Sequence, residues 1–402
     1  MSSIWDCAPL RELCDFHNGL WTGKKGPFQT AKIIRNTNFT PDGRIDLSDV
    51  ATLQVETRHL AKRRLKKGDI IIEKSGGGPK QPVGRVVLFQ LDAEDYSFSN
   101  FTSVIRVKHP NRLDSTYLHR VLYWWYLSGL TEPLQRRSTG IRNLDFDAYK
   151  SLEVPLPPLD EQERIVAVLD QAFASLDRAR VNAEANLADI DSLLTRATAE
   201  IFTGVVEVGR LSAVSEVADH CLGKMLDRNK NTGELRPYLR NMNVRWFEID
   251  QSDLLEMRIE DREVERYLVK KGDLLICEGG YPGRASIYDS DAPIFFQKAL
   301  HRVRFRSSVM SKVLMYWLHL QDRTGALKDH FTGAGIQHFT GQALARFRMP
   351  VADEKVLVAA VARLDALHQS IADLSVGVRQ KLAHITRLRK SLLQAAFSGQ
   401  LT

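Results

Sequence analysis

The sequence predicts a mixed α/β (α+β) fold in which two globular lobes with strand-rich cores are separated by two long antiparallel α-helices. Three observations support this fold. The chain repeats itself, each copy begins with short β-branched runs, and each copy ends in a stretch with apolar residues at helical spacing. Its 402 residues also exceed one ordinary domain of roughly 150 residues.

The internal repeat is the strongest of these observations. Residues 67–72 (KGDIII) return as residues 271–276 (KGDLLI), displaced by 204 positions. Other pairs recur in the same order, with displacements between 193 and 205: Arg35-Asn36 with Arg240-Asn241, Gly84-Arg85 with Gly283-Arg284, Tyr123-Trp124 with Tyr316-Trp317, Pro155 with Pro350, and Phe202 with Phe397. We therefore expect duplication of a unit of about 200 residues, with the two copies related by a pseudo-twofold axis.

The first part of each copy has the composition of a strand-rich domain. In the first copy, residues 69–74, 84–89 and 101–107 are β-branched runs bounded by Gly, Pro, Asn and Asp, which predicts strands. Pro155, Pro157 and Pro158 then exclude helix before residue 159.

A long helix is predicted to follow each lobe. From Ile165 to Ile201 the apolar residues recur every 3.6 positions on average, which is the α-helical period. The second copy behaves alike from residue 353 to residue 398, and Gly204 and Gly399 are predicted to be the C-terminal caps. Helices of about 44 residues would span roughly 65 Å. Alternatively, each helix packs on its own lobe.

Charge is unevenly distributed along the chain. The net charge of +7 permits a polyanionic partner, and it is the sum of +7 in residues 1–150, −6 in 151–205, +3 in 206–350 and +3 in 351–402. No apolar run approaches the ~20 residues that cross a bilayer, and the start lacks a leader pattern, so we expect a cytoplasmic protein without a membrane partner. Four cysteines without metal or disulfide spacing are expected to be reduced and buried.

No catalytic constellation is found. Residues 19–25 resemble a phosphate loop but have three residues between the glycines where four are required. Asp69, Glu73 and Lys74 resemble a nuclease site, but adjacent Glu73 and Lys74 point to opposite faces of a strand. We therefore expect no catalytic residues, no metal site and no cofactor in this chain, and a binding function.

Basic and amide side chains in loops are the candidates for binding a polyanion such as DNA, because they contact phosphates and base edges. In the first copy they are Lys24, Lys25, Arg35, Asn36, Asn38, Lys74, Ser75, Lys80, Gln81, Arg85, Asn100, Arg136, Arg137, Ser138, Thr139 and Arg142. In the second copy they are Lys224, Arg240, Asn241, Asn243, Tyr281, Arg284, Gln297, Lys298, His301, Gln337 and His338.

Two interpretations remain open for the repeated residues. Arg35-Asn36 and Arg240-Asn241 bind DNA, or they form turns and hydrogen bonds that both lobes need in order to fold. Residues that differ between the copies, such as Lys24-Lys25 against Lys224-Met225, are better candidates for specificity.

The whole chain resembles the specificity subunits of type I restriction-modification systems. The resemblance is carried by the order lobe, long helix, lobe, long helix, by the repeated KGD motif, by residues 155–162 (PLPPLDEQ), and by Phe202-Thr203-Gly204 and Phe397-Ser398-Gly399. It implies a target-recognition domain at 1–155, a long spacer and docking helix at 156–204, a second target-recognition domain at 205–350 and a second helix at 351–402. The second proline block departs from the pattern, since it has one proline and Lys355 where the first copy has glutamine.

The resemblance implies a non-catalytic, DNA-binding subunit. Each lobe would bind one half of a bipartite site in double-stranded DNA, and the helices would set the spacing and dock two methyltransferase (modification) subunits. Those partners bind S-adenosylmethionine and methylate adenine, and two restriction (motor-nuclease) subunits can join them. The alternatives are a protein-binding assembly scaffold and a self-sufficient DNA methyltransferase or nuclease.

Overall fold

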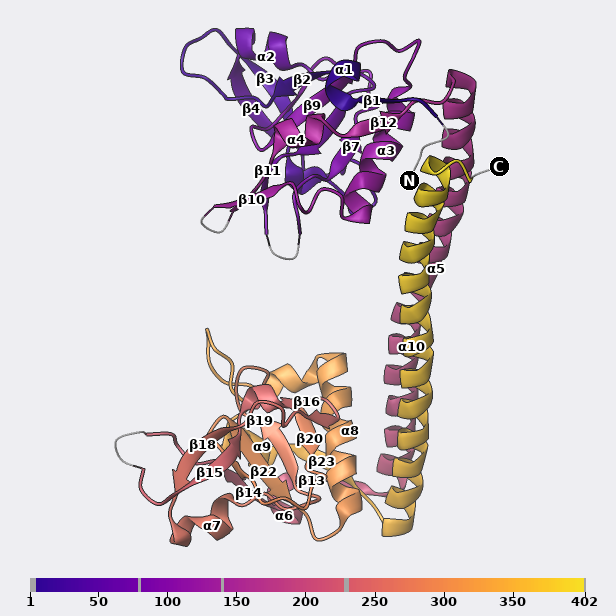
Figure 1. The fold of residues 1–402 in the computed structure, drawn as a ribbon. Helices are drawn as coiled ribbons and strands as arrows, with labels where there is room; N and C mark the ends of the chain where they lie inside the picture. The colour runs from indigo at the N-terminus through magenta and orange to yellow at the C-terminus, as the bar shows by residue number, and fades with distance from the viewer. Residues whose placement is uncertain (1–4, 79–80, 139–140, 228–230, 401–402) are drawn as a thin grey trace. The chain divides into compact units, whose positions relative to one another are not determined.

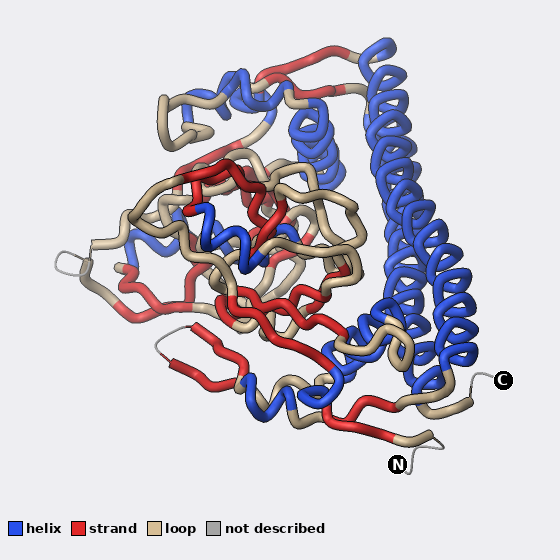
Figure 2. The backbone as a smooth tube through the Cα atoms, turned by 90° about the horizontal axis from the view of Figure 1, so that it is seen from above, coloured by secondary structure: helices blue, strands red, loops and turns tan. Residues whose placement is uncertain are grey.

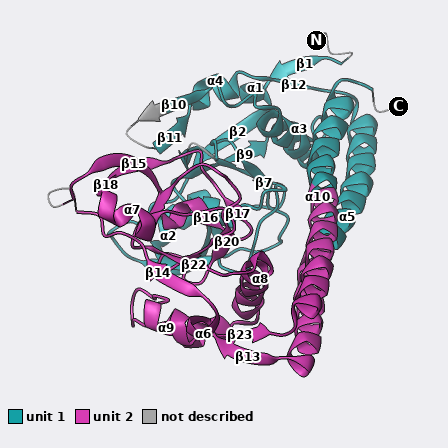
Figure 3. Ribbon diagram, turned by 90° about the horizontal axis from the view of Figure 1, so that it is seen from below, with its two compact units in different colours: residues 1–183, 380–402 teal, residues 184–379 magenta. Residues whose placement is uncertain are grey.

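The computed structural model describes residues 5–78, 81–138, 141–227 and 231–400, and within them it has the mixed α/β fold expected from the sequence. The chain forms two compact units (Figure 3). Unit 1 comprises residues 1–183 and 380–402, and unit 2 comprises residues 184–379. Helix α5 (Leu159–Val208) begins in unit 1 and ends in unit 2, whereas α10 (Glu354–Phe397) begins in unit 2 and ends in unit 1.

Unit 1 is built around a four-stranded sheet of order β2-β9-β5-β7 and a three-stranded sheet of order β4-β3-β8 (Figure 1). Two smaller sheets pair β1 with β12 and place β11 between β10 and β6. The strands are β1 (Cys7–Pro9), β2 (Cys14–Asn18), β3 (Phe28–Ile34), β4 (Ala51–Glu56), β5 (Ile70–Glu73), β6 (Ser75–Gly77), β7 (Val86–Leu88), β8 (Tyr96–Phe98), β9 (Thr102–Val107), β10 (Gln135–Ser138), β11 (Ile141–Leu144) and β12 (Glu153–Pro155). The helices are α1 (Leu10–Leu13), α2 (Thr57–Arg63), α3 (Ser115–Ser128), α4 (Phe146–Lys150) and the 3-10 turn η1 (Asn36–Asn38).

Unit 2 repeats this topology. Its sheets have the orders β14-β22-β19-β20, β18-β15-β21 and β13-β23, which match the corresponding sheets of unit 1, and a short β16-β17 pair is added. The strands are β13 (Arg210–Ala213), β14 (Asp219–Leu222), β15 (Glu234–Leu239), β16 (Val244–Arg245), β17 (Glu248–Ile249), β18 (Leu255–Ile259), β19 (Leu274–Cys277), β20 (Ala285–Ile287), β21 (Phe295–Phe296), β22 (Leu300–Arg304) and β23 (Arg348–Val351). The helices are α6 (Val214–Val217), α7 (Asp261–Tyr267), α8 (Ser308–Thr324), α9 (Gly341–Arg346) and the 3-10 turns η2 (Asn241–Asn243) and η3 (Ala326–His330).

The repeated KGD motif is a structural element of both units. Asp69 accepts a hydrogen bond from the Lys66 amide (2.7 Å) and forms a bidentate ion pair with Arg106 on the neighbouring strand (2.6 Å for both bonds). Asp273 does the same with Lys270 (2.7 Å) and Arg304 (2.7 and 2.6 Å). Because each aspartate is buried, removal of its arginine partner would leave an uncompensated charge, which is strongly destabilising.

The core of unit 1 includes both long helices. Leu169 and Phe173 of α5 pack in one cluster with Tyr117 and Leu122 of α3 and with Phe397 of α10, so the start of α5 lies beside the end of α10 (Figures 1 and 2). Arg120 on α3 also forms an ion pair with Asp170 on α5 (2.7 Å).

The core of unit 2 is built in the same way. Phe202 and Val205 of α5 share a cluster with Leu318 of α8 and with Leu357 and Leu364 of α10. Within each unit, therefore, the two long helices pack on each other and also on the lobe of that unit. The sequence posed pairing of the two helices and packing of each helix on a lobe as alternatives, and within each unit both occur.

Some sequence-based expectations need correction. Gly204 does not end a helix, because α5 continues to Val208, whereas Gly399 has φ +74° just after α10 and fits the predicted cap. All four cysteines are free, but Cys7 is exposed rather than buried, and Cys221 is only partly buried. Among the described residues, no helix is long and apolar enough to cross a membrane.

Candidate nucleic-acid interface

The loop between β2 and β3 presents exposed side chains on a rigidly held backbone. Glu56, at the end of β4, is 2% exposed and accepts hydrogen bonds from the backbone amides of Lys24 (2.7 Å) and Lys25 (2.5 Å). The amide of Lys25 is the main cause that lowers the pKa of the Glu56 carboxyl to about 2. The ammonium groups of Lys24 and Lys25 are exposed and have no partner among the described residues.

A cavity of about 370 Å³ lies beside this loop. Its apolar lining includes Trp21 and Phe101, which are 68% and 43% exposed. Its polar lining consists of Thr22, Arg35, Asn36, Ser99 and Asn100, and its remaining apolar lining of Leu20, Ile33 and Leu53.

The repeated Arg and Asn residues fall into two groups. Asn38 is buried, its Oδ1 accepts from the Arg35 amide (2.9 Å), and its Nδ2 donates to the carbonyls of Asp46 and Asp49. Asn243 makes the same bonds to Arg240, Asp250 and Asp253 in unit 2. For Asn38 and Asn243 the structure thus favours the folding interpretation, in which both lobes need them as hydrogen-bond formers.

In unit 1, Asn36 and Arg85 belong to a partly buried network around Glu73. Glu73 accepts from Asn36 Nδ2 (2.9 Å) and from Arg85 Nε (2.7 Å). Arg85 also donates to the carbonyls of Asn36 (3.0 Å) and Phe39 (3.2 Å), and with Gln81 it lines a cavity of about 380 Å³. The charge of Arg85 is therefore compensated within the lobe.

In unit 2 the equivalent arginine has no carboxylate partner among the described residues. Cys277 stands where Glu73 stands in unit 1, and Arg284 donates to the carbonyl of Asn241 (2.9 Å). The guanidinium group of Arg284 lies 4.3 Å from the ring centroid of Tyr281, which is exposed. Asn241 Nδ2 donates to the carbonyl of Gly279 (3.1 Å).

The second basic segment of unit 1 is a hairpin, β10-β11. Ser75 Oγ donates to Asn143 (2.6 Å), Arg142 donates to Gln135 (3.3 Å), and exposed Arg136 pairs with Asp145. The ammonium group of Lys74 donates a hydrogen bond to Oδ1 of Asn18, which lies at the end of β2 (2.9 Å). Of the other predicted residues here, Lys80 and Thr139 lie outside the described residues, and the side chains of Arg137 and Ser138 are not described either.

The remaining candidates of unit 2 are divided between surface and core. His301 is 0% exposed, and its Nε2 lies 2.7 Å from the carbonyl of Phe339, so the structure places it in the core and not on the surface. Lys224 is also buried and pairs with Glu263. His338 Nδ1 lies 3.0 Å from Glu278 Oε2. The side chains that face solvent more openly are Gln297, which is half-buried, and Lys298 and Gln337, which are exposed.

Comparison with known proteins finds one family model and several similar chains. Residues 3–186 match the family model described as the type I restriction modification DNA specificity domain. The EcoKI specificity subunit of Escherichia coli K12 is 23% identical over 99% of this chain and 89% of its own length. The StySPI specificity subunit of Salmonella potsdam is 23% identical over 99% of this chain and 89% of its own.

Almost the whole chain is thus similar to specificity subunits of type I restriction-modification systems. A putative specificity subunit of Haemophilus influenzae is 33% identical, but over only 37% of this chain and 38% of its own. Two solved structures share the fold of this chain. One, from work on assembly and conformational transition of a type I R-M system, has a TM-score of 0.79 at 20% identity and covers 99% of this chain and 98% of its own. The other, the HsdS subunit of Thermoanaerobacter tengcongensis, has a TM-score of 0.55 at 19% identity and covers 99% and 97%.

The proline-rich motif at the start of α5 has a structural role. Gln162 is fully buried, donates to the carbonyls of Arg112 (3.0 Å) and Pro157 (2.8 Å) and accepts from the amide of Asp114 (2.9 Å). Lys355, its counterpart in the second copy, is exposed. The departure of the second proline block from the family pattern therefore removes a buried hydrogen-bond network from unit 2.

Three residues beside the predicted candidates were not singled out from the sequence. Trp21, Phe101 and Glu56 are not basic or amide residues, and Tyr281 was the only aromatic residue among the candidates. A signal was present, because Trp21 lies between the glycine and the lysines of the segment that resembles a phosphate loop. An aromatic residue beside paired lysines is a pattern typical of nucleic-acid contacts.

Proposed function

We propose that this chain is the DNA-reading subunit of a type I restriction-modification complex, and that each lobe reads one half of a bipartite site. The observation that carries this proposal is that the two units have the same core structure but different exposed loop residues. Both units share sheet orders and the Asp–Arg pairs that hold them, yet the loop residues that each displays are different. Two similar scaffolds with different exposed side chains suit two different half-sites.

Within this proposal the predicted residues have two roles. Asn38, Arg85, Asn243, His301 and buried Lys224 position the loops, since they are held by protein partners. The exposed candidates contact DNA, and those with the best access are Lys24, Lys25, Tyr281, Lys298 and Gln337. Gln81 and Arg136 are exposed as well, and the other described candidates would contact DNA from half-buried positions.

We propose that the paired helices act as spacer and as docking surface. Helices α5 and α10 would set the distance between half-sites and bind two methyltransferase subunits, with restriction subunits joining them. S-adenosylmethionine would be bound by the methyltransferases, which would extrude a target adenine from the duplex to modify it. A cytoplasmic location follows from a DNA partner. The match of residues 3–186 to the type I specificity domain and the fold shared with a chain from work on type I R-M assembly support these partners.

The test is an exchange of one lobe. Residues 1–155 would be replaced by the same region of another specificity subunit, which keeps β1 and β12 together because these strands pair. We expect the adenines methylated by the complex to change in one half of the sequence and to be unchanged in the other. A matched exchange of residues 210–350 should change only the other half, and the modular proposal fails if both halves change, or neither.

Two measurements separate the alternatives. A scaffold would assemble with its partners but add no salt-sensitive binding to duplex DNA, whereas a DNA-reading subunit loses affinity steeply as salt concentration rises. A self-sufficient enzyme would methylate or cut DNA as the purified chain. In the described ranges, no cluster of three His, Cys, Asp or Glu side chains is arranged to hold a metal ion.

A further inference from the structure

The cavity beside Trp21 has the chemistry of a site for one planar heterocycle. Its volume of about 370 Å³ is near the lower end of small-ligand pockets, roughly 300–1,000 Å³, and is too small for a helix about 10 Å across. Two of its lining residues, Trp21 and Phe101, are large aromatics with much of their surface in solvent. Exposed aromatic rings that line one cavity are typical of a ligand-binding groove.

Several polar groups that line the cavity have donors or acceptors that are not used in hydrogen bonds among the described residues. Ser99 Oγ is inaccessible to solvent and has no partner among the described residues. The side-chain amide of Asn100 has none there either, and the Oδ1 atom of Asn36 can still accept, because only its Nδ2 is used, toward Glu73. A hydroxyl and two amides offer both donors and acceptors, as recognition of a base edge requires.

Positive charge lies next to the aromatic residues. Lys24 and Lys25 follow Trp21 in the loop that Glu56 holds, and both ammonium groups are exposed and unpaired within the described part of the chain. A stacking ring with cations at nearby positions is the combination that binds an unstacked base and its phosphates.

We infer that this cavity binds a single unstacked nucleobase of the half-site that lobe 1 reads, with Trp21 and Phe101 as stacking surfaces and Lys24 and Lys25 on the adjoining phosphates. The inference rests on the proposed function, since it requires that lobe 1 binds DNA. It makes the two lobes unequal. The bridges Leu20–Ser99 and Lys224–Gln297 align the two copies and place Met225 at the position of Trp21 and Ala299 at that of Phe101, which corrects the pairing of Lys25 with Met225 made from the sequence. Lobe 1 thus extrudes a base, and lobe 2 binds its half-site without extrusion.

The experiment uses the full chain in complex with its methyltransferase subunits. Duplexes containing the methylated sequence would carry 2-aminopurine at successive positions of the lobe 1 half-site, since the fluorescence of this base depends on the rings on which it stacks. We expect the fluorescence to change on binding at one position besides the target adenine. Trp21→Ala and Phe101→Ala should abolish that signal and weaken binding roughly 5- to 100-fold, while the signal at the target adenine is retained.

Control variants distinguish stacking from other effects. Trp21→Phe should restore most of the signal, and Met225→Ala, an exposed position in lobe 2, should leave it unchanged. Trp21 is so exposed that its removal should not unfold the lobe, which a thermal unfolding measurement checks.

Each contrary result has a distinct meaning. If the wild-type complex binds its site but shows no second unstacked position, and Trp21→Ala changes affinity by less than about twofold, the base-binding inference is wrong and the proposed function stands. If Trp21→Ala weakens assembly with the methyltransferase and not DNA binding, the cavity holds a protein partner and the inference is again overturned. If the wild-type complex shows no sequence-specific binding at all, the proposed function itself fails.

Discussion

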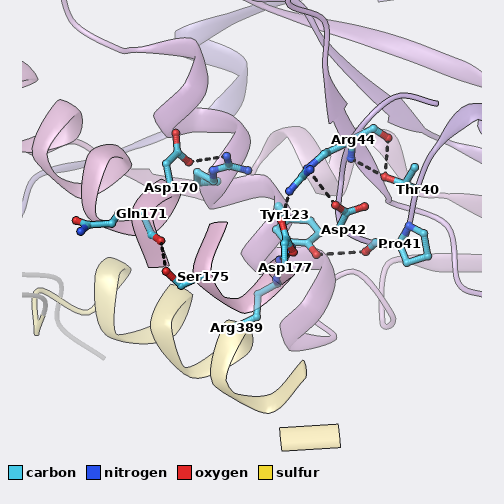
Figure 4. Close-up of polar contacts among 11 residues, drawn as sticks. Thr40, Pro41, Asp42, Arg44, Tyr123, Asp170, Gln171, Ser175, Asp177 and Arg389 are labelled. Atoms are coloured by element: carbon cyan, nitrogen blue, oxygen red, sulfur yellow. Dashed lines mark hydrogen bonds and ion pairs between the residues drawn. The ribbon is translucent and has the colours of Figure 1, made fainter. Parts of the chain in front are cut away.

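The two units attach their lobes to the long helices at equivalent places by different physical means. In unit 1, Asp177 of α5 pairs both with Arg44 of the loop after η1 and with Arg389 of α10 (Figure 4). In unit 2, the ring of Phe247 packs against His368 of α10, with ring centroids 4.1 Å apart. One junction is therefore an ion-pair clamp, and the other combines an aromatic contact with the ion pair of Lys312 and Asp365 of α10 (2.6 Å).

The backbone at these junctions shows what the aromatic contact costs. Gly43 has φ +79° in unit 1, and Phe247, 204 positions later, has φ +64° in unit 2. Glycine adopts this left-handed conformation freely, whereas a bulky residue is strained there. The strain is offset by the position of the Phe247 ring among Tyr316, His319 and His368. Duplicated scaffolds can thus keep a turn conformation while replacing the chemistry that uses it.

The largest effect is expected from breaking the clamp of unit 1. Asp177→Ala leaves Arg389, which is 9% exposed, without a counter-charge, so unit 1 should lose about 3 kcal/mol of stability. Hydrogen exchange on peptides from residues 5–155 measures this loss against peptides from residues 210–350. Arg44→Ala is the matched control: Arg44 is an exposed partner, and its removal should cost only about 0.5 kcal/mol. Equal losses in both units would contradict a clamp local to unit 1.

The aromatic contact of unit 2 should be nearly as sensitive. Phe247→Ala removes a half-buried ring and should cost unit 2 about 2 to 3 kcal/mol in the same exchange measurement. Phe247→Gly loses the same ring but relieves the left-handed strain, so it should be about 1 kcal/mol more stable than the alanine variant. The strain interpretation would be abandoned if glycine were the worse of the two.

Acid should weaken the aromatic junction. Burial lowers the pKa of His319 to about 4, and burial also lowers the pKa of His368. Between the unfolded value near 6.5 and about 4 the unfolded chain binds more protons, so stability of unit 2 falls as pH falls through this window. Wild-type unit 2 loses stability between pH 7 and pH 5, and in the His319→Gln variant this loss of stability should be smaller by about 1 to 2 kcal/mol.

The control for this pH effect lies in unit 1. His119 is fully buried there, and burial lowers its pKa to about 3, so unit 1 also becomes less stable in acid. Its pH dependence should be the same in wild type and in His319→Gln. If the stability of unit 2 changed with pH in the variant as it does in the wild type, His319 would not be the cause of the acid effect.

The smallest expected effects concern a pair of repeated glycines with opposite environments. Gly204 lies within helix α5 with open space around an added Cβ, so Gly204→Ala should stabilise the chain by about 1 kcal/mol. Gly399 has φ +74°, so Gly399→Ala should destabilise it by up to about 1 kcal/mol. Thermal unfolding of the two variants tests this difference, and shifts of the same sign would contradict it.

Much of the fold was predictable because it depends on local pattern and repetition. The run 69–74 contains β5, and the second long helix was expected at 353–398 and lies at Glu354–Phe397. The error at Gly204 has a simple cause. A glycine costs a helix only about 1 kcal/mol, and burial of Phe202 and Val205 on either side outweighs that cost.

The candidate site was less predictable, because residue type does not reveal burial. Asn38 and Asn100 look alike in the sequence, yet Asn38 is enclosed by bonds to its own loop while the side chain of Asn100 lines a cavity. His301 was expected at the surface and lies in the core, since its strand, β22, is central in the main sheet of unit 2. Such placements follow from tertiary contacts that no local pattern encodes.

The path of α10 has a consequence for synthesis of the protein on the ribosome. Leu393 and Phe397 complete the core of unit 1, where Phe397 packs against Tyr117 and Trp124 with ring centroids 5.6 Å apart in each case. The lobe at residues 1–155 is translated first, but its core is completed by side chains that are made about 240 residues after that lobe ends. A chain that ends before Leu393 would expose a hydrophobic surface on that lobe. Proteases and chaperones recognise such surfaces, so they can distinguish incomplete chains from complete ones.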